Sequence, residues 1–141
     1  MVATPYQTTA SVGVAPFVDI LTIPVFACSA IANADELAAY TIGTNFEVLK
    51  IDFVCVTPIT TGAKTATLTP YIGSTAIPGT VTALAGTKTK GSVTNVFTAS
   101  VTSKLYGGVT DTFKLTGSAV TAFVEGAGYF LVQYRNLGNN A

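Results

Sequence analysis

The stretch NFEVLKIDFVCV, residues 45–56, has the clearest strand pattern in the chain and decides the fold class. Apolar and polar side chains alternate along it, as they do in a strand with one buried face. The alternation changes phase once, which predicts a β-bulge near the middle of the strand. The apolar side chains form two sets, with Phe46 and Val48 on one face and Leu49, Ile51, Phe53 and Cys55 on the other.

Other segments have short β-branched or alternating patterns of the same kind, separated by turn residues. Pro24 lies near the end of the first segment and favours an edge strand or a bulge there. About seven or eight short strands without long crossover helices fit a sandwich or a barrel, and we expect an all-β fold, an antiparallel, jelly-roll-like β-sandwich. These segments are FVDILTIPVFA (17–27), TATLTPYIG (65–73), AIPGTVTALA (76–85), SVTNVFTAS (92–100), DTFKLTGS (111–118) and GYFLVQY (128–134).

One segment, NADELAAYTIG (33–43), carries a helix signal. Asn33 suits the N-cap, Glu36 suits the third helical position of a capping box, and Gly43 suits the C-terminal end. The pattern allows one or two helical turns, and a loop remains the alternative.

Residues 1–16 read as an extended N-terminal arm, and residues 17–141 as a single β-sandwich domain. The arm contains Pro5 and Pro16, has no charged side chain and has no helical period. Proline limits its use in the interior of a sheet. We expect the arm to serve attachment to a partner more than folding. The alternatives are that it forms the first strand of the sandwich or is exchanged between protomers.

The low charge of the chain points to an assembly. Charged residues make up 10% of it and hydrophobic residues 49%, whereas average soluble domains are about 25% charged. The 24 threonines supply part of the missing polar surface. The remaining deficit predicts apolar surface that a partner covers, and hence a homo-oligomer, which we expect to be a trimer.

The charge balance also argues against two classes of partner. The formal net charge is zero, and no basic run is present to neutralise phosphates or to meet an anionic membrane. The chain has no stretch of 18 apolar residues, so no transmembrane helix is expected, and the N-terminus lacks signal-peptide features. We therefore expect no nucleic acid and no membrane among the partners, and synthesis in the cytoplasm.

The residue inventory offers little for catalysis. The chain has no histidine, which removes the usual general base and the commonest metal ligand. Cys28 and Cys55 are expected to be buried free thiols rather than zinc ligands or a disulfide. The segment TTGAKT (60–65) lacks the glycine spacing of a phosphate loop, so Lys64 reads as a hairpin-tip charge. We predict no catalytic, cofactor-binding or metal-binding residues, and no cofactor.

The segment AVTAFVEGAGYFLVQY (119–134) holds a carboxylate, Glu125, between apolar runs. Gly126 and Gly128 supply backbone freedom, so the segment is predicted to be a hairpin with Glu125 as a solvated turn residue. A glycosidase would need a carboxylate pair, for which Asp111 and Glu125 are the candidates, but this reading is disfavoured because Asp111 suits a turn before a strand. Four tyrosines are candidates for a sugar-binding platform, although core or interface positions are the simpler expectation: Tyr71, Tyr106, Tyr129 and Tyr134.

Two stretches resemble a family of small tailed-phage virion proteins. They are FEVLKIDFVCVTPITTGAKTATLTPYIGSTAIPG and AVTAFVEGAGYFLVQYRNL, with matching positions at residues 46–79 and 122–134. That family tends to have an F-x-V-x-x-I-x-F-V strand, a T-G-A-K-x-A-T-L segment, an I-G-x-T-x-I-x-G turn and a final A-F-x-x-G-x-G hairpin. The resemblance covers about half of the chain, in the right order, and rests on turn and strand patterns.

The resemblance implies a trimeric head decoration (cement) protein with a β-sandwich fold. Such a protein binds the major capsid protein on the outside of the capsid shell and has no catalytic residues. The localisation that follows is the virion exterior. The alternative function is a carbohydrate- or receptor-binding module of a phage head or tail fibre. A third alternative, a β-sandwich hydrolase, is disfavoured by the missing histidine.

Overall fold

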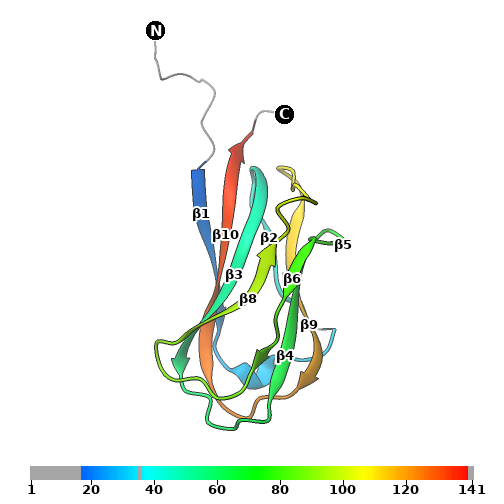
Figure 1. The fold of residues 1–141 in the computed structure, drawn as a ribbon. Helices are drawn as coiled ribbons and strands as arrows, with labels where there is room; N and C mark the ends of the chain where they lie inside the picture. Colours follow the sequence, from blue (N-terminus) through cyan, green and yellow to red (C-terminus); the bar gives the residue numbers. More distant parts are fainter. Residues whose placement is uncertain (1–16, 35, 140–141) are drawn as a thin grey trace.

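A computed structural model describes residues 17–34 and 36–139, which form ten β-strands and one short 3-10 turn. No α-helix occurs in this described part (Figure 1). The arm predicted for residues 1–16 lies outside it. The elements are β1 (Phe17–Val25), η2 (Cys28–Ala30), β2 (Glu36–Thr41), β3 (Asn45–Thr57), β4 (Thr65–Ile72), β5 (Thr75–Ala76), β6 (Gly79–Val81), β7 (Leu84–Ala85), β8 (Val93–Ala99), β9 (Thr112–Thr121) and β10 (Ala127–Gly138).

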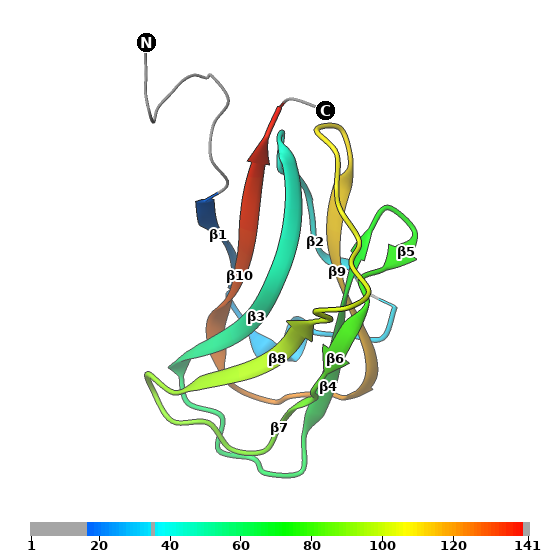
Figure 2. The ribbon, with the colours of Figure 1, turned by 45° about the horizontal axis from the view of Figure 1, so that its top comes forward.

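The strands form two antiparallel sheets, which confirms the predicted all-β architecture. Sheet A has the order β1-β10-β3-β8-β6, and sheet B has the order β2-β9-β4-β5, with β7 also paired to β4. The sheets lie against each other with the strands running lengthwise (Figure 2). Between them lies one hydrophobic cluster, whose largest members include six buried phenylalanines: Phe46, Phe53, Phe97, Phe113, Phe123 and Phe130.

The bulge predicted in residues 45–56 is confirmed. In the pairing with β10, Lys50 lies opposite Gln133 and Val48 lies opposite Tyr134, so Leu49 is the extra residue. The bulge corrects the expectation that the two apolar sets face opposite ways. Because one residue is inserted, both sets point into the core, and only Leu49 stays half-exposed. The buried positions are Phe46, Val48, Ile51, Phe53 and Cys55.

Residues 33–43 were predicted to form a short helix or, alternatively, a loop. Both predictions are wrong, because residues 36–41 form β2. This strand pairs with β9, with Tyr40 opposite Phe113. Asn33 does not cap a helix, and its Oδ1 instead accepts a hydrogen bond from the backbone N–H of Val120 (2.9 Å). A two-turn helix gains little on its own in water, whereas the exposed edge of β9 offers a full ladder of hydrogen bonds.

The segment predicted as a strand at residues 76–85, with an early break at Pro78-Gly79, is divided among three short strands: β5, β6 and β7. β5 and β7 pair with β4 in sheet B, whereas β6 pairs with β8 in sheet A. Gly79 permits the close approach to β8, because a Cβ there would lie 2.4 Å from the carbonyl oxygen of Thr98. The segment therefore crosses between the sheets and closes one side of the sandwich.

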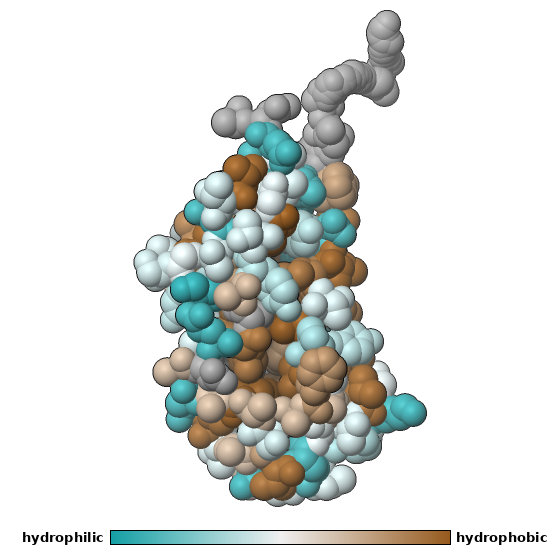
Figure 3. Space-filling view, turned by 180° about the vertical axis from the view of Figure 1, so that it is seen from behind, coloured by the Kyte–Doolittle hydropathy of each residue, from teal (hydrophilic) through white to brown (hydrophobic). Residues whose placement is uncertain are grey.

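The opposite side of the sandwich is open between β1 and β2. Each is the edge strand of its sheet in the described part of the chain, β1 pairing with β10 and β2 with β9. The edge position predicted from Pro24 is thus confirmed. Seen from this side, hydrophobic atoms line a hollow in the surface (Figure 3).

The predicted hairpin at residues 119–134 is wrong. β9 belongs to sheet B and β10 to sheet A, so residues 122–126 connect the two sheets. Lys64 lies in a connection of the same kind, because β3 belongs to sheet A and β4 to sheet B. The prediction that Lys64 lies at the tip of a hairpin is therefore wrong. Turn residues indicate that the chain reverses direction, but they do not indicate which sheet the next strand joins.

Candidate interaction surface

The outer face of sheet A changes character along the strands. Its middle carries polar side chains, including Lys50 and Asp52, whose charged atoms lie 3.2 Å apart. Asn95 on β8 donates a hydrogen bond to Asp52 Oδ1 (3.0 Å). An apolar row crosses the strands at one end of this face, and a charged cluster lies toward the other.

The apolar row joins four strands in direct register. Tyr129 on β10 lies opposite both Pro24 on β1 and Val54 on β3, and Val54 lies opposite Val93 on β8. All four side chains are exposed or half-exposed, and the exposed fraction of Val93 is 63%. Cross-strand neighbours of this kind form a continuous surface. We call this surface the apolar row; it consists of Pro24, Tyr129, Val54 and Val93, together with the exposed Val56 next to them on β3.

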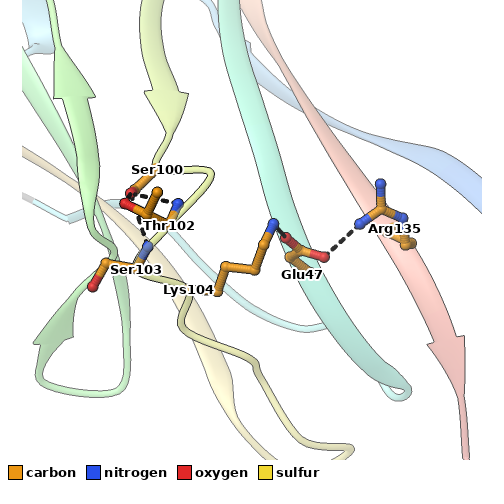
Figure 4. Close-up of polar contacts among 6 residues, drawn as sticks. All are labelled: Glu47, Ser100, Thr102, Ser103, Lys104 and Arg135. Carbon is orange, nitrogen blue, oxygen red and sulfur yellow. Dashed lines mark hydrogen bonds and ion pairs between the residues drawn. The ribbon is translucent and has the colours of Figure 1, made fainter.

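The charged cluster is built around Glu47, the one buried charged residue found in the described part of the chain. Glu47 alternates with the core residues Phe46 and Val48, so it points to the outer face. Arg135 lies opposite it on β10 and places Nη1 2.5 Å from Oε1. Lys104 reaches over from the β8–β9 loop and places Nζ 2.7 Å from Oε2 (Figure 4).

Two opposing effects set the pKa of Glu47. Burial raises the pKa of this carboxyl, but the hydrogen bond and charge of Lys104 and then those of Arg135 outweigh it, so the pKa lies below its usual range. Glu47 is therefore ionised at neutral pH and ties the β8–β9 loop to sheet A.

The β8–β9 loop, residues 100–111, presents further apolar side chains. Phe46 and Gly107 exchange two backbone hydrogen bonds of 2.8 and 2.9 Å, which hold the middle of the loop against β3. Ser100 Oγ accepts hydrogen bonds from the N–H groups of Thr102 and Ser103 near its start (Figure 4). The exposed apolar side chains of the loop are Val101, Tyr106 and Val109.

A groove with an apolar lining runs between β1 and β2 on the open side of the sandwich. Its volume is about 330 Å³. Glu36 is the charged residue of the lining, and its Oε2 lies 3.3 Å from the Nζ of Lys114. We call this the edge groove; it is lined by Pro24, Val25, Phe26, Ala27, Ala30, Ile31, Glu36 and Leu37. Phe26 at its rim is 90% exposed.

Glu125 fastens two inter-sheet connections together instead of pointing freely into solvent. Its Oε1 accepts hydrogen bonds from the backbone N–H groups of Thr60 (3.0 Å) and Thr61 (2.8 Å). Its Oε2 accepts a third from the hydroxyl of Thr61 (3.2 Å). These bonds, that of the Thr61 N–H above all, lower the pKa of Glu125. The prediction of a solvated turn residue is therefore corrected to a half-exposed residue that anchors residues 58–64.

We expect Glu125→Ala to speed amide hydrogen exchange at Thr60 and Thr61 at neutral pH, because both N–H groups lose their acceptor. The folded-state pKa of Glu125 is lowered, so its contribution is present above the unfolded pKa, about 4.3, and is lost as pH falls through the folded value. Exchange measured by NMR checks this, with Glu36→Ala as a control carboxylate variant. Unchanged protection at both amides in Glu125→Ala contradicts the assignment.

The carboxylates weighed for catalysis are not brought together. Asp111 precedes β9 and accepts a hydrogen bond from the N–H of Gly108 (2.7 Å), whereas Glu125 follows β9. The ten residues of β9 separate them. At about 3.4 Å of rise per residue, this distance exceeds the range of a glycosidase pair.

The four tyrosines do not share a platform. Tyr134 is part of the core, and its hydroxyl donates to Asp19 Oδ2 (3.2 Å). Tyr71 lies on β4 in sheet B, Tyr129 lies on β10 in sheet A, and Tyr106 lies in the β8–β9 loop. The core or interface reading is confirmed for Tyr134 alone.

Both cysteines are buried free thiols, as predicted. Burial, followed by the proximity of Cys55, raises the pKa of Cys28 to about 11. A thiol of this kind stays protonated at neutral pH and packs as a small apolar side chain. Over residues 17–34 and 36–139, no three side chains of the metal-binding types gather into a possible ion site. The same residues contain no helix of the length and hydrophobicity required to span a membrane.

No protein-family model, no curated protein and no solved structure matches this chain. The resemblance to tailed-phage decoration proteins therefore remains a prediction.

The sequence contains a signal for the apolar row that the strand predictions did not include. Residues 53–56, FVCV, are apolar on both faces of the strand. Phe53 and Cys55 fill the core, which leaves Val54 and Val56 for the outside. The Glu47 cluster had no such signal, because Lys104 lies 57 residues away in the sequence.

Proposed function

We propose that this protein is a non-enzymatic phage decoration (cement) protein that binds the outside of the capsid shell as a homotrimer and stabilises it. The major capsid protein is the proposed partner. The apolar row carries the proposal, because it is an exposed apolar surface that spans four strands of one sheet in a chain with few charges. Burying apolar surface yields roughly 25 cal/mol per Å², and a shell repeats each contact many times.

The strand order gives support at the level of the fold. A jelly roll packs two antiparallel four-stranded sheets against each other, and such folds recur in viral capsid and lectin domains. The order β2-β9-β4-β5 and the first four strands of the order β1-β10-β3-β8-β6 are compatible with such a fold, with β6 and β7 as additional short strands. We accordingly propose a jelly-roll-like sandwich. A fold alone does not establish a function, so the proposal depends on the surface.

We expect Val93→Asp and Val56→Asp to weaken binding to capsid shells that lack the protein by at least tenfold each. Burying one valine contributes about 1.5 kcal/mol or more, and about 1.4 kcal/mol corresponds to a factor of ten. Both positions are exposed, so folding is expected to be retained. Ser118→Asp, which adds the same charge to an exposed position of sheet B, is the control.

Co-sedimentation of each variant with stripped shells measures this binding, and imaging of particles with and without the protein locates it. Equal binding by Val93→Asp, Val56→Asp and Ser118→Asp contradicts the assignment of the row as the capsid contact. Particles with no density for the protein on their outer surface contradict the decoration function itself.

One observation favours the alternative, a carbohydrate- or receptor-binding module. A shallow pocket of about 200 Å³ on sheet B is lined by Glu36, Tyr71, Gly73, Ser74, Lys114 and Thr116. A half-exposed tyrosine beside charged and hydroxyl groups suits a sugar ring. Retention on a glycan array that Tyr71→Ala abolishes, without any shell binding, would favour this function over decoration.

A further inference from the structure

The two long sides of the sandwich are built differently. On one side, the crossing segment with β5, β6 and β7 joins the edges of both sheets. On the other side, β1 and β2 face each other without pairing in the described part of the chain, and the edge groove lies between them. Partly buried apolar side chains from both strands extend the apolar surface along this side: Leu21, Leu37 and Tyr40.

The edge of β1 is poorly suited to receive another strand by backbone pairing. The N–H of Ile20 donates to Asp19 Oδ1 (2.8 Å), so one outward-facing donor is already occupied. Pro24 has the same parity along the strand as Ile20 and has no N–H to offer. Side chains of this kind protect natural edge strands from further pairing. An occupant of this side is therefore expected to bind mainly through its own apolar side chains in the edge groove.

Residues 1–16 are a chain segment of suitable chemistry. They contain no charged side chain and carry Val2, Tyr6, Val12 and Val14. Sixteen residues extend to about 50 Å, which exceeds the roughly 30 Å length of a nine-residue strand such as β1. Apolar side chains are thus present both in the sequence of the segment and in the lining of the groove.

The place where this segment joins the domain argues for a groove on another molecule. It joins at Phe17, at one end of β1, whereas the groove begins at Pro24, near the other end. To reach its own groove, the segment must reverse immediately before Phe17 and run back along the protected edge of β1. To reach the groove of a neighbouring molecule, it needs no reversal.

We propose that residues 1–16 of one copy bind in the edge groove of a second copy of this chain. The contact joins two different surfaces, the segment of one protomer and the groove of the next. Head-to-tail contacts of this kind form rings when the rotation closes, and a trimer is the smallest such ring beyond a dimer. This inference goes beyond the proposed function, because it holds whatever larger partner the oligomer binds.

Two variants and a control test the exchange by light scattering at matched protein concentration. Deletion of residues 2–15 removes the segment and keeps the groove. Ala27→Glu places a charge in the groove at an exposed position and keeps the segment. Ala39→Glu makes the same change at an exposed position of β2 outside the groove lining. We expect wild type and Ala39→Glu to be oligomers and the two other variants to be monomers.

Mixing the deletion variant with Ala27→Glu distinguishes exchange from an intramolecular arm. The mixture contains one intact segment and one intact groove on different chains, so a one-to-one heterodimer is expected. If the two variants stay monomeric in the mixture, the proposed exchange is wrong. An oligomer that survives in Ala27→Glu also overturns it, and so does a monomeric wild type. If the deletion variant aggregates, the comparison of the oligomeric states of Ala27→Glu and Ala39→Glu still tests the proposal.

The decoration function is tested separately from the exchange. Shell binding that persists in monomeric Ala27→Glu leaves the proposed function intact and shows that the exchange serves only oligomerisation. Loss of shell binding by Val93→Asp in an intact oligomer supports the decoration function without bearing on the exchange.

Discussion

Gly128→Ala is expected to lower the free energy of unfolding by about 3 kcal/mol, at the upper end of the range for overpacking. A Cβ at Gly128 would lie 2.1 Å from the carbonyl oxygen of Val54 and 2.7 Å from the ring of Phe53. The first of these atoms belongs to the backbone of β3 and cannot swing aside. The clash is relieved only if β10 separates from β3, its neighbour near the centre of sheet A.

Thermal and chemical denaturation measure this loss, which corresponds to a fall in melting temperature of roughly 10 °C for a domain of this size. Gly62→Ala is the matched control, because a Cβ there meets one atom only, Thr87 Cγ2 at 3.8 Å. Equal melting of the two alanine variants would contradict the close approach of β10 to β3.

The two glycines that flank Ala127 are required for different reasons, although the sequence suggested one. Gly126 has a φ of +109°, in the region that favours glycine, and it provides the backbone freedom expected of a turn. Gly128 has no such φ and is required by the space next to β3. A sequence shows where glycine occurs, but the second requirement depends on Val54, which lies far away along the chain.

Local patterns predicted the strands well where burial on one face decides the structure. Residues 65–72 alternate between apolar side chains and threonine or tyrosine, and β4 alternates in burial in the same way. The bulge at Leu49 was also visible, because a change of phase is a local feature. These predictions needed only the period of a strand.

Features that depend on distant partners were not predictable in this way. β2 was read as a helix or loop because Asn33, Glu36 and Gly43 suit the cap positions of a short helix, and its pairing with β9 overrode that local signal. The connection through Glu125 was read as a hairpin because Gly126 and Gly128 suit a tight turn. The prediction failed because β10 pairs with β3, which lies far earlier in the chain. The same limit applies to the candidate surface, whose apolar row joins residues from four strands.

Lys104→Met combined with Arg135→Met is expected to lower the free energy of unfolding by about 3 kcal/mol at pH 7. Methionine keeps much of the apolar length that covers Glu47 but removes both charges. Removing the partners of a buried charge typically costs about 3–5 kcal/mol. The lower end applies here, because Lys104 and Arg135 are themselves 35% and 39% exposed and Glu47 lies near the surface of sheet A.

The dependence on pH identifies the cause of this loss. In the wild type, the pKa of Glu47 is lowered, so the cluster stabilises the fold above the unfolded pKa of about 4.3 and loses this contribution as pH falls through the folded value. In the double variant, burial alone acts and raises the pKa, so protonation relieves the buried charge as the pH is lowered. The difference in stability between the two proteins is therefore expected to shrink from pH 7 to pH 4.

Adding Glu47→Leu to the double variant separates the buried charge from lost packing. The triple variant replaces the whole cluster by apolar side chains, a change that is often neutral or stabilising for buried ion pairs. We expect the free energy of unfolding of the triple variant at pH 7 to return to within about 1 kcal/mol of the wild-type value. We also expect that the stability difference between the triple variant and the wild type does not show the pH dependence expected for the double variant. Urea denaturation of the three proteins at pH 7 and pH 4 measures both effects. If the triple variant is no more stable than the double variant, the loss comes from packing of the β8–β9 loop, and Glu47 does not act through its charge.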